Sequence, residues 1–262
     1  MKKTLIALIV ATSAVVSGSS MAWTGGDFNG SVDFGGTISP APVKNPWEVS
    51  SGTAVTDLNY QISANTQKIT IPVNKNIPVL GVRTIEAAFF NGASGLSPQI
   101  SYNNFVDFSK ASQGVGTLTL DVKNNDDDTK IGTMSVAFYA GAGYVSANNK
   151  DDSNVQQGSL YANAAGNAFF GGVPRSASMI DAEPWVTVAT LNPEYVANFQ
   201  NSNTSVGMFT PSKTSLNNKG LKYSAFYGAA IKSGASVNIS LDRKPYAAIN
   251  WKASLPVTVS YM

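Results

Sequence analysis

Residues 27–38, Asp-Phe-Asn-Gly-Ser-Val-Asp-Phe-Gly-Gly-Thr-Ile, carry apolar side chains at alternating positions for most of their length. In an extended strand this spacing places Phe28, Val32 and Phe34 on one face, where Gly30 lies between them. Two interpretations are open on this pattern alone. The segment is either the first strand of the chain's own sheet, with Gly30 marking a bulge, or an arm that adds a strand to a neighbouring copy, with Gly30 leaving room at a shallow point of its groove.

A secretory signal peptide is predicted over residues 1–22. Two lysines precede an apolar run over residues 5–16, and Ser20-Met21-Ala22 supplies the small residues that a signal peptidase reads. The run is too short to cross a bilayer, so we expect the exported mature chain to begin near Trp23. The signal contains two lysines and no acidic residue, so its removal lowers the net charge from +2 to zero. A neutral chain gives no indication of a nucleic-acid or anionic-membrane partner.

Cysteine and histidine are both absent from the sequence. Their absence excludes Ser-His-Asp and Cys-His catalytic centres, His/Cys zinc sites and histidine pH switches. An exported chain without disulfides must be held by a large core or by partners. The mature length is sufficient for one large all-β domain. Its 43% apolar and 13% charged residues are typical of a weakly charged β protein rather than a disordered one.

Alternating segments predict strands along most of the remaining chain. A proline-containing linker begins at residue 40, and the body of the domain is expected to start at Trp47. The clearest unit is a hairpin formed by residues 115–122 and 131–139 with a polar turn between them. Pro72 places the end of a strand over residues 68–73 at a sheet edge. Further strands are expected over residues 98–102, 105–108, 223–231, 235–241 and 248–261.

The middle of the chain is less regular. The periodicity fades over residues 140–184, which predicts an irregular insertion. A short helix is expected over residues 192–200, because Asn192 suits an N-cap and Pro193 the first turn. The aspartates at 126–128 lack the spacing of an EF-hand loop, so they are interpreted as a solvated turn and no metal site is predicted.

The last strand keeps its alternation to the second-last residue of the chain. Leu255, Val257, Val259 and Tyr261 fall on one face of the extended segment. A terminal strand that is regular to its end is expected to be locked into a sheet. We therefore expect this row to form half of an important interface.

The two ends of the mature chain carry a family resemblance. The start, Trp23-Thr-Gly-Gly-Asp-Phe-Asn-Gly-Ser-Val-Asp-Phe-Gly-Gly, closely resembles that of FaeG-type fimbrial subunits, the major subunits and adhesins of a group of enterobacterial chaperone–usher fimbriae. The similarity continues at Trp47-Glu, at Ala168-Phe-Phe-Gly-Gly, and at Leu255-Pro-Val-Thr-Val-Ser-Tyr.

The resemblance implies an all-β fold: an incomplete immunoglobulin-like sandwich, completed by a donor strand from a neighbouring subunit, with an irregular insertion containing a short helix. It implies a donor arm over residues 23–39 and a subunit domain over 40–262. A periplasmic chaperone would fill the acceptor groove first, and the arm of the next subunit would replace it at the outer-membrane usher. The implied product is a homopolymeric fimbria on the cell surface. The donor residues would be Phe28, Gly30, Val32 and Phe34, and the groove and chaperone contacts Leu255, Val257, Val259 and Tyr261.

Adhesion to host glycoconjugates is a further expectation. Sugar binding needs an aromatic platform beside fixed polar groups, and the insertion offers Tyr161, Phe170, Arg175 and Trp185 as candidate glycan-binding residues. The alternative is that Phe169, Phe170 and Trp185 anchor the insertion to the core. This alternative is favoured for Phe169 and Phe170, whereas Arg175 and Trp185 are the favoured binding residues. A minor or purely structural subunit without receptor binding therefore stays open.

Two other functional classes fit the sequence less well. An outer-membrane β-barrel would need evenly repeated strands of about 9–11 residues, and the strands expected here are uneven. A glycosidase would need two paired carboxylates, for which Asp107, Asp181, Glu183 and Glu194 are available without any indicated pairing. No enzymatic activity and no cofactor are predicted.

Overall fold

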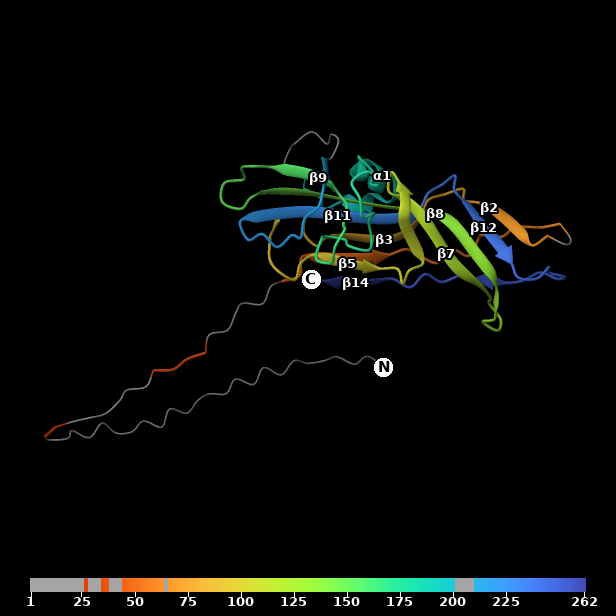
Figure 1. The fold of residues 1–262 in the computed structure, drawn as a ribbon, viewed down its shortest axis with the longest axis horizontal. Coiled ribbons are helices and arrows are strands. Elements are labelled where there is room, and N and C mark those ends of the chain that lie inside the picture. The colour runs from red at the N-terminus through yellow and green to blue at the C-terminus, as the bar shows by residue number, and fades with distance from the viewer. Residues whose placement is uncertain (1–25, 28–33, 38–43, 64–65, 201–209) are drawn as a thin grey trace. The chain divides into compact units, whose positions relative to one another are not determined.

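The computed structural model describes residues 26–27, 34–37, 44–63, 66–200 and 210–262 (Figure 1). The chain divides into two units, residues 1–41 and residues 42–262, and the second is called the body below. The predicted signal peptide and donor positions Phe28, Gly30 and Val32 lie outside the described residues. Within these ranges, no helix has the length and apolarity needed to cross a membrane.

The body is built almost entirely from strands. Its large sheet has the order β1-β3-β11-β8-β12-β2, with β4, β6, β7, β9, β10 and β13 paired to members of that path or to one another, and β14 and β5 form a second, two-stranded sheet. The strands are β1 (Trp47–Ser51), β2 (Lys68–Pro72), β3 (Ile77–Thr84), β4 (Phe90–Asn91), β5 (Pro98–Ser101), β6 (Val106–Ser112), β7 (Val115–Asn124), β8 (Lys130–Asn148), β9 (Gln156–Leu160), β10 (Thr210–Ser212), β11 (Leu221–Ile231), β12 (Ser236–Leu241), β13 (Trp251–Lys252) and β14 (Thr258–Tyr261).

The predicted hairpin is confirmed as β7 and β8, and the edge position indicated by Pro72 is confirmed by β2, which ends the sheet path. The prediction that regularity is lost after residue 139 is wrong for the first part of the insertion. Strand β8 continues to Asn148 and pairs with β11 over its whole second half. Residues 140–147 are all buried, so the polar positions that reveal a strand in a sequence are missing there.

The helix prediction over residues 192–200 is confirmed only for its first turn, which forms a 3₁₀ helix. The α-helix α1 (Pro184–Leu191) comes earlier, and only one 3₁₀ turn, η1 (Pro193–Val196), follows in the described part of this segment. Asn192 does cap this turn, because its side chain accepts a hydrogen bond from the Glu194 backbone nitrogen at 3.1 Å. Valine and threonine in α1 have restricted side chains in helices, so its sequence gives a weak helical signal. Packing against the sheet stabilises it instead.

The large sheet has two differently covered faces (Figure 1). On the outer face, α1 and η1 pack against Tyr139 of β8 and Phe226 of β11. Gly81 and Gly228 let Tyr195 approach the sheet, and a Cβ at Gly81 would lie 2.2 Å from its ring. The inner face carries the main core and faces β5 and β14.

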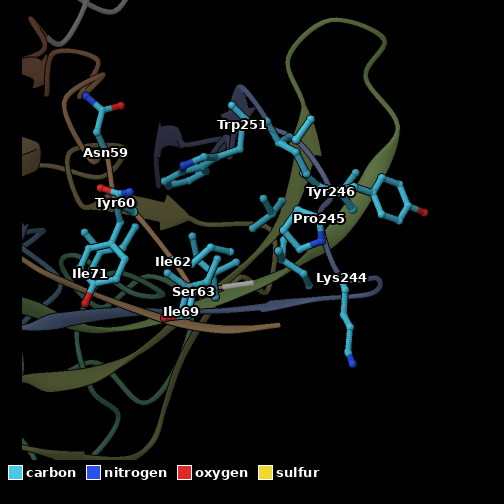
Figure 2. Close-up of a pocket in the computed structure, with 18 residues that line it drawn as sticks. Asn59, Tyr60, Ile62, Ser63, Ile69, Ile71, Lys244, Pro245, Tyr246 and Trp251 are labelled. Carbon is cyan, nitrogen blue, oxygen red and sulfur yellow. The ribbon is translucent and has the colours of Figure 1, made fainter. Parts of the chain in front are cut away.

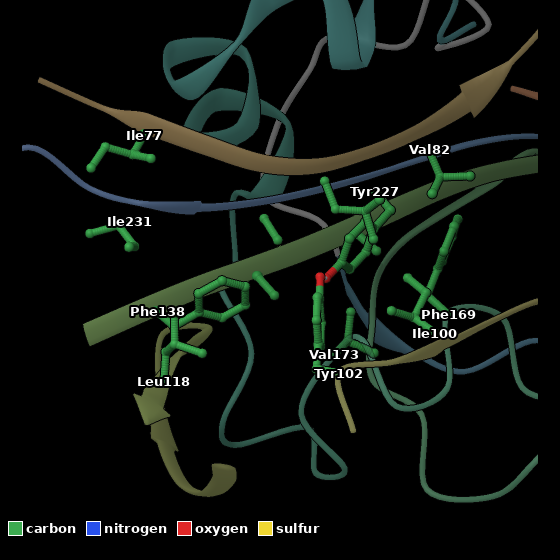
Figure 3. Close-up of a cluster of buried hydrophobic side chains, with 14 of the residues drawn as sticks. Ile77, Val82, Ile100, Tyr102, Leu118, Phe138, Phe169, Val173, Tyr227 and Ile231 are labelled. Carbon is green, nitrogen blue, oxygen red and sulfur yellow. The ribbon is translucent and has the colours of Figure 1, made fainter. Parts of the chain in front are cut away.

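The main core contains a buried chain of hydroxyl groups (Figure 3). The Tyr102 and Tyr227 hydroxyls are 2.7 Å apart, and Tyr227 also donates to the Gly172 carbonyl at 3.0 Å. Burial raises the pKa of both tyrosines above the ordinary value, so both stay protonated at neutral pH. This chain ties the loop at residue 172 to the centre of β11.

Candidate functional site

The C-terminal segment crosses the body in two short strands. β13 pairs with the end of β7, with Trp251 opposite Asn124, and β14 pairs with β5. Beyond β14, Met262 and Ser97 exchange backbone hydrogen bonds of 3.0 and 3.1 Å. The single strand expected over residues 248–261 is therefore present as two pieces, and its end is locked to a sheet as predicted.

The alternating row of the C-terminal segment is only half covered. Leu255, Val257, Val259 and Tyr261 contact the main core but stay partly exposed, whereas Thr258 and Ser260 between them are exposed. In the described part of the chain, β14 has one neighbouring strand, β5, and its other edge is free. A free edge beside a half-buried apolar row favours association with another chain.

The opposite edge of β5 is closed by a loop. The Phe169 nitrogen donates to the Pro98 carbonyl at 2.6 Å, and the Ile100 nitrogen donates to the Phe170 carbonyl at 2.8 Å. The outer edge of β14 is therefore the open side of this small sheet.

An apolar cavity of about 1000 Å³ lies beside Trp251, at the start of the C-terminal segment (Figure 2). Its walls come from residues 59–63 on one side and from residues 244–249 and Trp251 on the other, and neither 59–63 nor 244–249 belongs to a strand. Its floor consists of inward-facing side chains of the large sheet: Ile69, Ile71, Val122, Ile131, Ile239 and Leu241. We call this cavity, together with the half-covered C-terminal row, the groove.

Two aromatic side chains lie at the rim of the cavity. Tyr60 is 56% exposed and Tyr246 is 96% exposed, so neither fills the space between the walls. In the first unit, Phe34 is the one donor-strand candidate that is described, and its side chain is 93% exposed. The body thus has an unfilled apolar surface, and the first unit has an uncovered aromatic ring.

The candidate glycan-binding residues fall in two places. The Arg175 guanidinium lies 5.5 Å from the centre of the Phe170 ring. Tyr161 belongs to the same loop region, because the nitrogen of the next residue, Ala162, donates to the Pro174 carbonyl at 3.1 Å. Trp185 instead lies on α1 and packs against the outer-face cluster of Tyr139 and Phe226. Three of the four are therefore brought to one loop, and the fourth is not.

The neighbouring aromatic residue Phe169 anchors this loop. It is fully buried, stacks on Tyr227 with ring centres 5.5 Å apart, and meets the Trp47 ring edge to face at 5.7 Å. Trp47 and Phe169 both lie in segments that carry the family resemblance, and they thus pack together in the core.

The acidic residues considered for catalysis have structural partners. Asp181 accepts hydrogen bonds from the Tyr139 hydroxyl at 2.8 Å and the Thr187 hydroxyl at 2.6 Å, which fixes the start of α1. The Glu183 backbone nitrogen donates to the Asp181 carboxylate at 2.9 Å. Glu194 pairs with Arg83 at 3.0 Å. These contacts hold the outer face together and give the acidic residues structural roles.

The aspartate-rich turn between β7 and β8 is also held by local contacts. Asp127 accepts from the Thr129 hydroxyl at 2.7 Å, and Asp128 pairs with Lys252 at 2.5 Å. Lys252 holds the pKa of Asp128 below its usual range. Among the described residues, no group of three or more acidic side chains is arranged to hold a metal ion.

Known proteins resemble this chain along its whole length. The family model described as fimbrial, major and minor subunit matches residues 1–262. The K88 fimbrial proteins AC and AD of Escherichia coli are each 29% identical to it, and the F41 fimbrial protein of Escherichia coli is 28% identical. Each alignment covers 100% of both chains.

Proposed function

We propose that this chain, which belongs to the K88-type family of major and minor fimbrial subunits, polymerises by receiving in its groove the N-terminal arm (residues 23–39) of a second copy. Family membership makes the chain a non-enzymatic structural subunit of a surface fimbria, which assembles with other fimbrial subunits. The glycosidase alternative is thereby excluded. The donor-strand mechanism is our proposal, and the groove is the observation that carries it.

The chemistry of the arm matches that of the groove. In an extended arm, the alternation of the sequence would place Phe28, Val32 and Phe34 on one face, and the cavity offers a floor of aliphatic side chains. Each of these three side chains contributes roughly 1.5–3 kcal/mol when it leaves water. Backbone pairing along the free edge of β14 adds about 0.5–1.5 kcal/mol net per hydrogen bond. Because donor and acceptor are different surfaces, the contact repeats head to tail and makes an open filament.

Cysteine pairs test this joint directly, since the chain has no cysteine of its own. We expect Tyr246→Cys at the cavity rim, combined with Asp27→Cys or Gly35→Cys on either side of the donor residues, to give a ladder of disulfide-linked multimers from assembled fimbriae. The pair that reacts identifies the direction of the arm. Non-reducing electrophoresis after mild oxidation measures the ladder.

A matched control places the second cysteine away from the groove. Val186 on α1 is exposed and lies on the outer face, so Val186→Cys with the same arm cysteines should leave monomers. Intact filaments in which both Tyr246→Cys pairs stay monomeric would show that the arm binds elsewhere.

We also propose that a periplasmic chaperone covers the groove before assembly. The arm of the next subunit then replaces the chaperone at the outer-membrane usher. The half-buried row at Val257 and Val259 and the free edge of β14 support this order. Uncovered, they would expose the subunit to non-specific association during export.

Adhesion to host glycoconjugates is proposed for the loop that contains Tyr161, Phe170 and Arg175. The cation above an aromatic ring combines a flat apolar surface with hydrogen-bond donors. We expect Arg175→Ala to weaken glycan binding at least tenfold without changing the melting temperature, because its side chain is exposed. A glycan array with purified fimbriae measures the binding.

Trp185 is the control within the same proposal. Because Trp185 packs against the outer-face cluster, we expect Trp185→Ala to lower the melting temperature. If Trp185→Ala instead loses glycan binding at an unchanged melting temperature, Trp185 belongs to the glycan site. Full binding in Arg175→Ala would contradict the loop site. If the wild type binds no glycan, the protein is a purely structural or minor subunit.

A further inference from the structure

An exposed apolar loop lies beside the first described residues of the body. The loop has the sequence Ile85-Glu-Ala-Ala-Phe89, of which residues 85–88 are exposed and Phe89 is partly exposed. Together with Lys44 and Pro46 it lines a hollow of about 200 Å³. Single apolar residues are common on protein surfaces, but a contiguous group of them indicates a contact site. We call residues 85–89 with Lys44 and Pro46 the exit patch.

The exit patch is held in place by hydrogen bonds on several sides. The Ile85 backbone nitrogen donates to the Pro46 carbonyl at 2.8 Å. The Asn198 side-chain amide donates to the Thr84 carbonyl at 2.7 Å and to the Ile85 carbonyl at 3.2 Å. Lys44 and Glu86 pair at 3.4 Å, so they neutralise each other at its edge. An ordered, neutral surface of this kind binds a partner at a lower entropic cost than a flexible loop does.

The length of the linker identifies the partner. In the proposed assembly, residues 23–39 lie in the groove of a second copy, so only residues 40–43 separate that copy from Lys44. The chain from Ser39 to Lys44 spans at most about 18 Å when fully extended, whereas a domain of this size is about 40 Å across. The linker sequence Pro40-Ala-Pro-Val43 is also typical of a semi-rigid spacer. The second copy must therefore lie close to the exit patch, whichever direction its groove takes.

We propose that the exit patch packs against the end of the groove of the second copy that holds the arm, as an additional contact between the same two bodies. This inference rests on the proposed function. Each end of the groove offers an exposed apolar side chain, Tyr246 beside the cavity and Met262 beyond β14. Because the arm already joins the two bodies, the additional contact forms at a high effective concentration, and a small patch is sufficient. The contact fixes the angle between successive bodies and stiffens the filament.

Filament stiffness measures this contact separately from polymerisation. We expect Ile85→Asp and Ala88→Asp to form filaments whose persistence length is at least twofold lower, because packing of the bodies would desolvate the new carboxylate. Electron microscopy of purified fimbriae measures the persistence length. Val186→Asp on α1 is the matched control and should leave it unchanged, because Val186 is 47% exposed and Ile85 is 45% exposed, but Val186 does not belong to the patch. Ile85→Leu keeps an apolar side chain and should also form filaments as stiff as the wild type.

Chemical cross-linking tests the same contact at the level of residues. We expect Ala88→Cys, combined with either Tyr246→Cys or Met262→Cys, to give covalent multimers when assembled fimbriae react with a short bis-maleimide. The pair that reacts identifies the end of the groove at which the arm leaves it. Val186→Cys with the same partners is the control and should leave monomers.

The disulfide ladder between the arm and the cavity rim separates the two possible failures. If that ladder forms but both Ala88→Cys pairs stay monomeric, the contact between bodies is ruled out and the proposed function stands. The same conclusion follows if filaments of Ile85→Asp and Ala88→Asp are as stiff as those of Val186→Asp. If the ladder does not form in intact filaments, the arm binds elsewhere, and both the proposed function and this contact are overturned.

Discussion

Deletion of residues 23–39 is expected to abolish fimbria formation while leaving a subunit that the chaperone still captures. The deleted arm lies in the first unit, and the core strands all belong to the body. Loss of Phe28, Val32 and Phe34 removes roughly 1.5–3 kcal/mol each from the joint, which weakens it about a thousandfold or more. Electron microscopy of the cells and co-purification with the chaperone measure the two outcomes.

Gly30→Leu is the matched point variant for the deletion. If Gly30 lies over a shallow point of the groove, a leucine should overpack the joint at a cost of about 1–3 kcal/mol or more and stop polymerisation. The melting temperature of the variant body, with its groove filled by a normal arm, should not change. An equal loss of body stability would support the other interpretation, in which residues 27–38 form a first strand of their own domain. Normal filaments from the deleted chain would contradict both.

Strands are easiest to predict from this sequence where one face is buried and the other is exposed to solvent. β2, β7 and β12 all alternate in this way, and all were predicted within a few residues of their bounds. The second half of β8 was missed because it is covered on both faces, which removes the polar positions. α1 was missed for a related reason: its stability comes from packing on Tyr139 and Phe226, contacts that local propensity does not encode.

The candidate site was only partly predictable for a similar physical reason. The apolar row of the C-terminal segment could be placed on one face from alternation, and the structure leaves that row half covered. The floor of the cavity joins Ile71 to Ile239, residues of strands far apart in the chain, so only the sheet order brings them together. Its rim residues, Tyr60 and Tyr246, lie on irregular segments and follow no period.

Val257→Asp is expected to abolish chaperone capture and to cause degradation of the subunit in the periplasm. Val257 is partly buried in the middle of the half-covered row and contacts the main core. A carboxylate there would be desolvated by any strand that fills the groove, and an unpaired polar group in such a place costs about 1–3 kcal/mol or more. The steady-state amount of subunit and its co-purification with the chaperone measure the effect.

Thr258→Asp provides the matched control, because the adjacent side chain points to the other face and is exposed. The same new charge one residue along the strand should leave capture and assembly intact. Removal of residues 260–262 should behave like Val257→Asp, because it deletes Tyr261 and both backbone hydrogen bonds between Met262 and Ser97. If Val257→Asp and the truncated chain accumulate and assemble as Thr258→Asp does, the C-terminal row is not a wall of the groove, and the cavity beside Trp251 must be occupied without it.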